Sequence, residues 1–437
     1  MIASIVFVAL FAAAVFLFAK NVGKISRNIK LGKPADYSDN KADRLKTMLM
    51  VAFGQSKMVV RPIPGLLHIL VYVGFVIINL EVLEIIIDGI FGTHRIFSFL
   101  GGFYNFLIGS FEWLALLVLT ACAIFLVRRN VLRLPRFRKP ELNGFPTTDA
   151  NLILVTEILL MTAFLTMNAG DLVLQGRGVE HYTVAGAFPV SGMLATLLGG
   201  WSDGALIALE RGTWWFHIIG ILAFLNYLPY SKHLHIVLAF PNTYYSNLKP
   251  KGQFTNDANV MREVKLMLDP TADPYAAPPA DAAPVTFGAK DVTDLTWKNL
   301  MDAYSCTECG RCTSVCPANL TGKKLSPRKI MMDTRDRLEE VGKNIDKHGK
   351  DYSDGKHLLG DYISEEELWA CNTCNACTDA CPVNIDPLAI IMDLRRNLVM
   401  EESKAPASLM NMFSNIENNA APWQFAQSDR LNWRDEQ

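Results

Sequence analysis

Eight of the nine cysteines lie in two short runs that share one spacing. The runs read CTECGRCTSVCP, from Cys306 to Pro317, and CNTCNACTDACP, from Cys371 to Pro382. Both follow C-x2-C-x2-C-x3-C-P, which is typical of bacterial ferredoxins with two iron–sulfur clusters. Three closely spaced thiolates hold three corners of a cubane cluster, while the fourth cysteine of each run reaches the other cluster. The two runs therefore predict a pair of centres that pass single electrons.

The same pattern predicts which cysteines share a cluster. Structural zinc sites are the alternative, but zinc ligands usually come as separated C-x2-4-C pairs, not as repeated triplets followed by proline. The ninth cysteine, Cys122, stands alone in an apolar segment, where a buried structural thiol is expected. We expect one [4Fe–4S] cluster on Cys306, Cys309, Cys312 and Cys381, and a second on Cys371, Cys374, Cys377 and Cys316.

Apolar residues are concentrated in the first half of the chain. Hydrophobic residues make up 50% of the 437 residues, and 42 Lys and Arg nearly balance 43 Asp and Glu, so nothing favours a nucleic-acid partner. The first apolar run has no basic residue before it and no clear cleavage site after it, so we expect a retained helix and not a signal peptide. Five segments are long and apolar enough to span a membrane: 2–19, 64–90, 103–127, 150–172 and 205–240.

Basic residues predict how these spans are oriented. Segments 20–61 and 127–139 are rich in Lys and Arg, whereas 88–102 contains only Arg95 and 173–204 only Arg177. The positive-inside rule then places the N-terminus outside and the second half of the chain in the cytoplasm. The expected location is a bacterial inner (cytoplasmic) membrane, in contact with its lipid.

The second half reads as a soluble helical domain. Pro327 is placed near a helix start, and Ser364 with Glu367 three residues later forms a capping-box pattern. The fold expected is all-α, with a five-span transmembrane helical bundle followed by a cytoplasmic α-helical ferredoxin domain that holds two [4Fe–4S] clusters. The expected divisions are a membrane domain at 1–245, a Pro- and Ala-rich linker at 246–295, the dicluster domain at 296–400 and a partner-docking tail at 401–437.

Histidines in or near the spans are candidate haem ligands. His68 near the start of the second span and His235 near the end of the fifth are expected at one depth, where two imidazoles can hold haem b. His217 lies eighteen residues before His235, about five helical turns, so one continuous helix would place both rings on one face. A second haem at His217 lacks an obvious partner, unless an outer-loop histidine such as His94 supplies it. His233 points to another face of the same expected helix, and His94 and His181 are expected at the surface.

Two blocks resemble a known membrane cytochrome. GLLHILVYVGF and WWFHIIGILAFLNYLPYSKHLHIV are similar to the cytochrome b subunit (gamma-subunit type) of respiratory nitrate reductases and to its relatives in heterodisulfide reductases. The soluble half resembles the dicluster ferredoxin subunit of heterodisulfide reductases. The resemblance implies five spans, an outside N-terminus and haem ligands on the second and fifth spans. In that family the second span carries two histidines ten residues apart, whereas this chain has His68 and then Ile78.

Electron transfer through a membrane haem points to a quinone as the small-molecule partner. Quinone chemistry moves two electrons and two protons, so a carboxylate near water would help, although such acids also occur as hydrated interfacial groups. Arg61 and Lys232 are candidate partners of haem propionates, or simple flanking charges. The candidate acids are Glu81, Glu84 and Asp88 at the outer end of the second span, with Glu112 and Glu157 near the ends of others.

The function favoured by these features is a subunit of a quinone-linked membrane oxidoreductase. It would move electrons between the quinone (menaquinone) pool and a separate cytoplasmic redox subunit, either a flavoprotein or a cysteine-rich iron–sulfur protein. No Cys-Cys pair and no dinucleotide fingerprint occur, so the substrate chemistry is expected on that other polypeptide. The main alternative is a membrane-anchored ferredoxin that acts as a redox sensor or assembly factor without haem. A transporter is disfavoured because no inverted repeat is visible.

Overall fold

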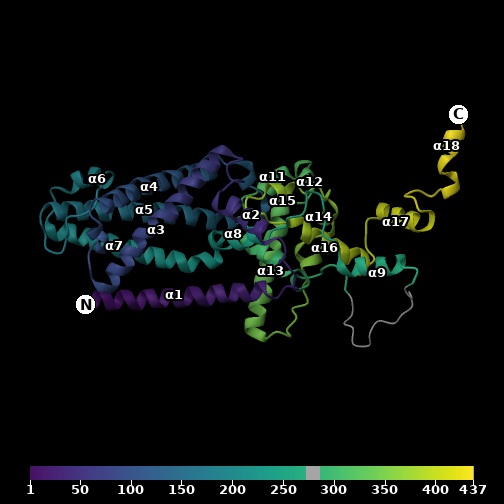
Figure 1. Ribbon diagram of the computed structural model, residues 1–437, viewed down its shortest axis with the longest axis horizontal. Coiled ribbons are helices and arrows are strands. Elements are labelled where there is room, and N and C mark those ends of the chain that lie inside the picture. The colour runs from purple at the N-terminus through teal and green to yellow at the C-terminus, as the bar shows by residue number, and fades with distance from the viewer. Residues whose placement is uncertain (272–285, 437) are drawn as a thin grey trace.

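Helices account for most of the structure, a computed structural model that describes residues 1–271 and 286–436 (Figure 1). About 71% of the residues are helical, and the described part of the chain contains isolated β-bridges but no strand. The predicted all-α class is therefore confirmed. Long helices form a bundle that contains the N-terminus, and shorter helices form a second body at one end of it (Figure 1).

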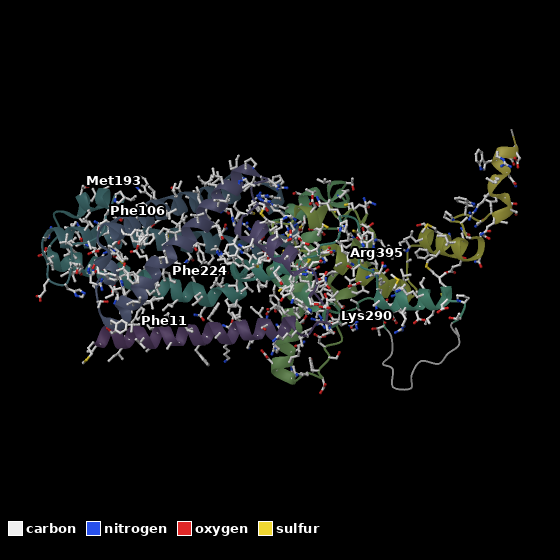
Figure 2. The ribbon with its side chains drawn as sticks, in the orientation of Figure 1. Phe11, Phe106, Met193, Phe224, Lys290 and Arg395 are labelled. Carbon is white, nitrogen blue, oxygen red and sulfur yellow. The ribbon has the colours of Figure 1, made fainter. Side chains whose placement is uncertain are left out.

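Five long helices build the bundle. Four of them are long and apolar enough to cross a membrane, namely α1, α3, α4 with its continuation to Val131, and α5. Many of their outward apolar side chains are exposed, as for Phe106, which is 67% exposed (Figure 2). The bounds are α1 (Ile2–Ile29), α3 (Pro62–Phe91), α4 (Gly102–Leu126), α5 (Phe145–Gly176) and α7 (Asp203–Tyr227).

The expected fifth span, 205–240, does not form one helix. The α7 helix ends at Tyr227, two short turns around Pro229 follow, and α8 (His235–Tyr244) begins only at His235. Proline lacks the N–H that a helix interior needs, which explains the break. The argument that His217 and His235 share a face of one helix is therefore wrong. The α7 helix carries three charged residues, Asp203, Glu210 and Arg211, and is not among the four helices that are long and apolar enough to cross a membrane.

Successive helices of the bundle run in alternate directions. The α1 helix starts at the end far from the second body and finishes against it, where Asn28 donates to the Tyr304 hydroxyl at 2.9 Å. The α3 helix starts beside that body, because Arg61 donates to Ser314 Oγ at 2.8 Å, and runs away from it. Near the far end, the Phe7 ring of α1 packs on Gly89 of α3, where a Cβ atom would meet the ring at 2.8 Å.

The second body contains both cysteine runs and is held to the bundle at more than one place. The buried Lys298 ammonium bonds Asp302 at 2.6 Å and the side-chain oxygen of Asn242 at 3.0 Å, and Asn242 in turn donates to the Val383 carbonyl at 2.8 Å. The helix starts predicted at Pro327 and Ser364 are confirmed, the latter with its capping box to Glu367. The helices of the second body are α10 (Trp297–Ser305), α11 (Arg311–Val315), α12 (Pro317–Leu320), α13 (Pro327–His348), α14 (Glu365–Trp369), α15 (Ala376–Ala380) and α16 (Pro387–Met400).

The predicted linker at 246–295 is not extended throughout, because α9 (Ala258–Leu268) lies within it. Most of the Pro- and Ala-rich stretch lies outside the described residues. The tail at 401–437 contains α17 (Ala407–Asn419) and α18 (Asn432–Asp435). The remaining elements are α2 (Lys41–Met48), α6 (Ser191–Leu198) and short 3-10 or π turns at Leu49–Phe53, Ile96–Leu100, Val127–Val131, Pro135–Phe137, Pro140–Leu142, Leu228–Tyr230, Lys232–Leu234, Val292–Asp294, Leu358–Tyr362 and Gln427–Leu431.

Candidate functional site

The two cysteine runs adopt the same local backbone. The second residue after the first cysteine has a positive φ in both, 55° at Glu308 and 54° at Thr373. The fourth residue does so too, 70° at Gly310 and 59° at Asn375. Left-handed residues at these places curl each loop before a short helix, α11 or α15, begins. The curl lets the thiols of one run converge.

Cysteines of the two runs come together across the sequence. Cys381, from the second run, lines one cavity with three cysteines of the first run, and α11 and α15 pack against each other. Cys316 of the first run lies near Cys371, and burial, together with the neighbouring thiols of Cys316 and Cys374, raises the pKa of Cys371. Among the described residues, no three His, Cys, Asp or Glu side chains are spaced for a single metal ion. Cysteines of both runs line one cavity, which leaves the space between the donors that a cubane cluster requires. The cavity contains Cys306, Cys309, Cys312 and Cys381.

Burial makes these thiols poor ligands until iron is present. It raises the pKa of Cys306, Cys377 and Cys381 to about 12 each. Thiolate, not thiol, ligates iron, so cluster binding must release the thiol protons. The positive charge of the iron then stabilises the buried thiolates. Cys122 is also buried, but it lies on α4, far from both runs in the sequence and on a different body of the structure.

Arginines fix the first cysteine run against the bundle. Arg311 donates to the carbonyls of Lys57 at 2.6 Å and Met58 at 3.2 Å. Arg328 donates to the Arg136 carbonyl at 2.9 Å and pairs with Glu141 at 2.7 Å. Both arginines are buried, so these bonds hold the loop in one position relative to the bundle.

Three histidines gather where the bundle meets this loop. The ring centroids of His68 and His235 are 6.4 Å apart, although the residues come from α3 and α8. Two imidazoles on opposite sides of one metal, each with a nitrogen about 2 Å from it, have centroids roughly 6 Å apart. His235 Nδ1 donates to the Lys232 carbonyl at 3.0 Å, while His68 Nδ1 is buried with no hydrogen-bond partner among the described residues. The pair therefore fits a bis-histidine haem.

His181 is exposed, as expected, but three other histidines differ from expectation. His233 belongs to this group, with its ring 5.5 Å from that of His235. His217 is buried in the bundle, where Nδ1 bonds the Leu160 carbonyl at 2.9 Å and the ring contacts Phe164. No second histidine ring contacts His217 in the described part of the chain, so its surroundings do not fit a bis-histidine haem. His94 is not a surface residue, since only 7% of its side chain is exposed.

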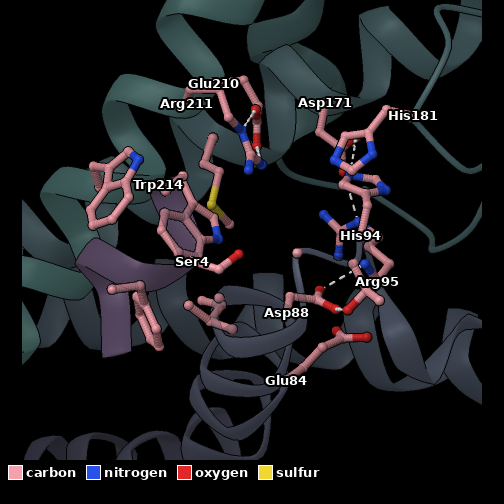
Figure 3. Close-up of a pocket in the computed structure, with 18 of the residues that line it drawn as sticks. Ser4, Glu84, Asp88, His94, Arg95, Asp171, His181, Glu210, Arg211 and Trp214 are labelled. Atoms are coloured by element: carbon pink, nitrogen blue, oxygen red, sulfur yellow. Dashed lines mark hydrogen bonds and ion pairs between the residues drawn. The ribbon is translucent and has the colours of Figure 1, made fainter. Parts of the chain in front are cut away.

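A polar pocket lies at the opposite end of the bundle from the cysteines, near the N-terminus (Figures 1 and 3). Its volume is about 250 Å³, close to the lower limit of small-molecule sites. One wall is aromatic, with Phe7, Trp214 and Trp215. The other carries charge, because His94 Nε2 lies 3.2 Å from Asp171 and Arg95 donates to the same carboxylate at 2.7 Å.

Several acids predicted from the sequence reach this pocket. Glu81, Glu84 and Asp88 line it, and Glu81 Oε2 is buried without a hydrogen-bond partner among the described residues. Glu112 and Glu157 lie outside its lining; Glu112 accepts bonds from Asn168 and from the backbone of Val190 and Ser191. Sequence reasoning did not identify four further lining residues: Arg95, Asp171, Glu210 and Arg211.

The charges expected near haem propionates have other partners. Lys232 pairs with Glu308 and donates to the Pro146 carbonyl at 2.7 Å, and Arg61 bonds Ser314. These contacts connect the bundle with the first cysteine run.

Comparison with known proteins agrees with the cysteine geometry. Two families described as "4Fe-4S dicluster domain" match residues 305–385 and 254–321. The homologues are iron–sulfur oxidoreductases. The chain is 29% identical to the probable iron-sulfur-binding oxidoreductase FadF of Bacillus subtilis, over 99% of this chain and 61% of that protein. It is 28% identical to the EtfAB:quinone oxidoreductase of Syntrophomonas wolfei, over 97% of this chain and 56% of that protein.

A third relative matches only part of the chain. This is a probable membrane-anchored ferredoxin of Chromohalobacter salexigens, 32% identical over 35% of this chain and 25% of that protein. The chain spans about three fifths of the length of the first two relatives. No solved structure matches it significantly. Together the matches support iron–sulfur clusters as cofactors and electron transfer as the role.

Proposed function

We propose that this chain is a membrane-bound electron-transfer subunit that links quinone to a cytoplasmic redox partner through haem b and two [4Fe–4S] clusters. The observation that carries the proposal is the order of features along the bundle. A polar pocket lies at one end, and the His68–His235 pair adjoins the cysteine cavity at the other. His68 and Glu84 are sixteen residues apart on α3, or ~24 Å along the axis.

The membrane arrangement belongs to the same proposal. The α7 helix packs against α5 and is the fifth span, despite its charged residues, of which Glu210 and Arg211 line the pocket. The pocket then lies on the outer side with the N-terminus, and the basic loops 20–61 and 127–139 lie inside with the cysteine runs. Lys and Arg on that side agree with the positive-inside rule in a bacterial inner membrane.

The chemistry at the pocket follows from its residues. Oxidation of a quinol releases two electrons and two protons, and the reverse reaction takes them up. The aromatic wall holds the ring, while His94 and Glu81 accept or return protons beside Asp171 and Arg95. At the other end, haem b held by the two imidazoles supplies one-electron chemistry. The Lys232 carbonyl keeps the His235 ring oriented, with its other nitrogen free to ligate.

The two clusters that the cysteines would hold would pass electrons one at a time to the partner. We assign one cluster to Cys306, Cys309, Cys312 and Cys381 and the other to Cys371, Cys374, Cys377 and Cys316. Cys374 is exposed, so the second cluster lies nearest to solvent. One relative is named for EtfAB and quinone, which supports an electron-transfer flavoprotein as the partner.

A reduced-minus-oxidised spectrum of the purified protein, with pyridine haemochrome and iron assays on the same sample, tests this function. We expect a b-type spectrum and about eight non-haem irons per chain, because two cubane clusters contain eight. The haem count also decides whether His217 ligates a second haem. Eight irons without haem would instead support a membrane-anchored ferredoxin, the role named for the Chromohalobacter relative.

Replacing His94 with glutamine is expected to lower quinone-dependent turnover at least tenfold, because a positioned proton carrier contributes about 10²-fold or more. Dithionite should still reduce the haem and the clusters fully. Arg177→Gln is the matched control, since Arg177 lies at the same end but bonds Asp203 and Trp201 outside the pocket. Equal turnover in His94→Gln and wild type would place quinone elsewhere.

A further inference from the structure

One buried acid joins the first cysteine run to the histidine group. Glu308 lies between Cys306 and Cys309 and is only 5% exposed. Its carboxylate pairs with Lys232 on one side and with Arg335, at 2.8 Å, on the other. A buried carboxylate with a lysine and an arginine at ion-pair distance is favoured in its charged form.

Lys232 touches both redox sites with different atoms. Its carbonyl oxygen accepts from the His235 ring, and its ammonium pairs with Glu308. The backbone of the same residue is anchored, because its N–H donates to Asp149 at 3.1 Å, and Asp149 also accepts from Ser231 at 2.7 Å. A single rigid turn therefore sets the position of His235 relative to the first cysteine run.

The second cysteine run has no buried ion pair to the bundle in its described contacts, although Asn242 donates to the carbonyl of Val383 just after the run. Its first cysteine is held from within its own body, where Arg395 donates to the Cys371 carbonyl at 2.6 Å. The ion pair on this run joins Asp379 to Lys251 at 2.6 Å, and both side chains are more than half exposed. Water and salt screen an exposed pair, whereas a buried charge acts on its neighbours strongly.

We propose that the Lys232–Glu308 pair positions the first cysteine run beside His235. The same pair sets the reduction potential of the first cluster, the one that Cys306, Cys309, Cys312 and Cys381 would hold. Electrons that pass through the bundle would then reach the cluster held by these four cysteines first and the second cluster afterwards. Each step moves one electron, so that the donor is oxidised as the acceptor is reduced. The order rests on the proposed function, but the effect on potential does not require haem.

Charge-removing variants test this inference, with each cluster's midpoint potential measured by EPR-monitored redox titration of the full-length protein. Glu308→Gln removes a negative charge and should raise the potential of the first cluster. Lys232→Met removes a positive charge and should lower it. A tenfold change in the oxidised-to-reduced ratio, ~59 mV for one electron, is the expected scale. The double variant should return near wild type, and the second cluster should not move.

Two further variants separate charge from fold. Lys232→Arg keeps the charge and should keep the wild-type potential. Lys251→Met removes an exposed lysine near the second run and should shift neither cluster. Equal shifts of both clusters, or no shift in either single variant, would overturn the proposal. A shift confined to the first cluster in a protein that contains no haem would support the tuning role and refute the haem of the proposed function, so the two failures are distinguishable.

Discussion

Replacing His235 with leucine is expected to remove haem b from the purified protein and to leave about eight non-haem irons in place. Leucine supplies no ligand, and the remaining His68 imidazole alone holds haem weakly. His68→Leu should have the same effect, since the two ring centroids lie 6.4 Å apart. Haem content, measured by pyridine haemochrome per mole of protein, should fall at least tenfold in both variants.

His233→Leu is the informative control for this prediction. His233 lies within the same group and contacts Phe224, so its loss changes packing by a similar amount. It should retain haem because His235 has the oriented ring nitrogen. Haem loss in His233→Leu with full retention in His235→Leu would instead make His68 and His233 the axial pair.

Replacing Cys381 with serine is expected to remove the cluster of the first run, although Cys381 belongs to the second. Cys381 lines the cavity with Cys306, Cys309 and Cys312, so the first cluster would lose its fourth thiolate. Non-haem iron should fall from about eight to about four per chain. The EPR signal lost in Cys381→Ser should be the one lost in Cys309→Ser.

The reciprocal change gives the second half of the test. Cys316→Ser should lose the signal that Cys374→Ser loses, because Cys316 lies near Cys371 on the other side of the pair of loops. Cys122→Ser should keep both signals and all the iron. If Cys381→Ser matches Cys374→Ser instead, each run holds its own cluster and the exchange of ligands is wrong.

The cysteine pattern was easy to interpret because spacing alone brings three thiols to one loop. Helix starts at Pro327 and Ser364 could also be predicted, since capping depends on residues only three apart. The prediction of a single helix over 205–240 was wrong, because the helix is broken around Pro229. How far a proline changes the direction of the chain depends on how the turns after it pack. Here Ser231 donates to the Asp149 carboxylate, and these two residues are far apart in the sequence.

The polar pocket could not be predicted from the sequence for the same reason. His94 and Arg95 follow the end of α3 and look like residues of a surface loop. The Asp88 carboxylate, however, accepts from the N–H groups of Arg95 and Ile96 and folds that loop back over the bundle. Their main partner, Asp171, is 76 residues from Arg95. Spacing within one segment carries no information about such a pairing.

The ties between the two bodies bear on how such proteins can be recombined. Tyr304 in α10 receives a bond from Asn28 in α1, and Lys298 in the same helix depends on Asn242 in α8. A cluster domain cut out at residue 296 would leave these polar groups without those partners, at a cost of about 1–3 kcal/mol for each one left buried. The cysteine domain therefore cannot be moved to another protein by itself without losing these bonds. A chimera that transplants it into another membrane scaffold has to bring the ends of α1 and α8 along with it.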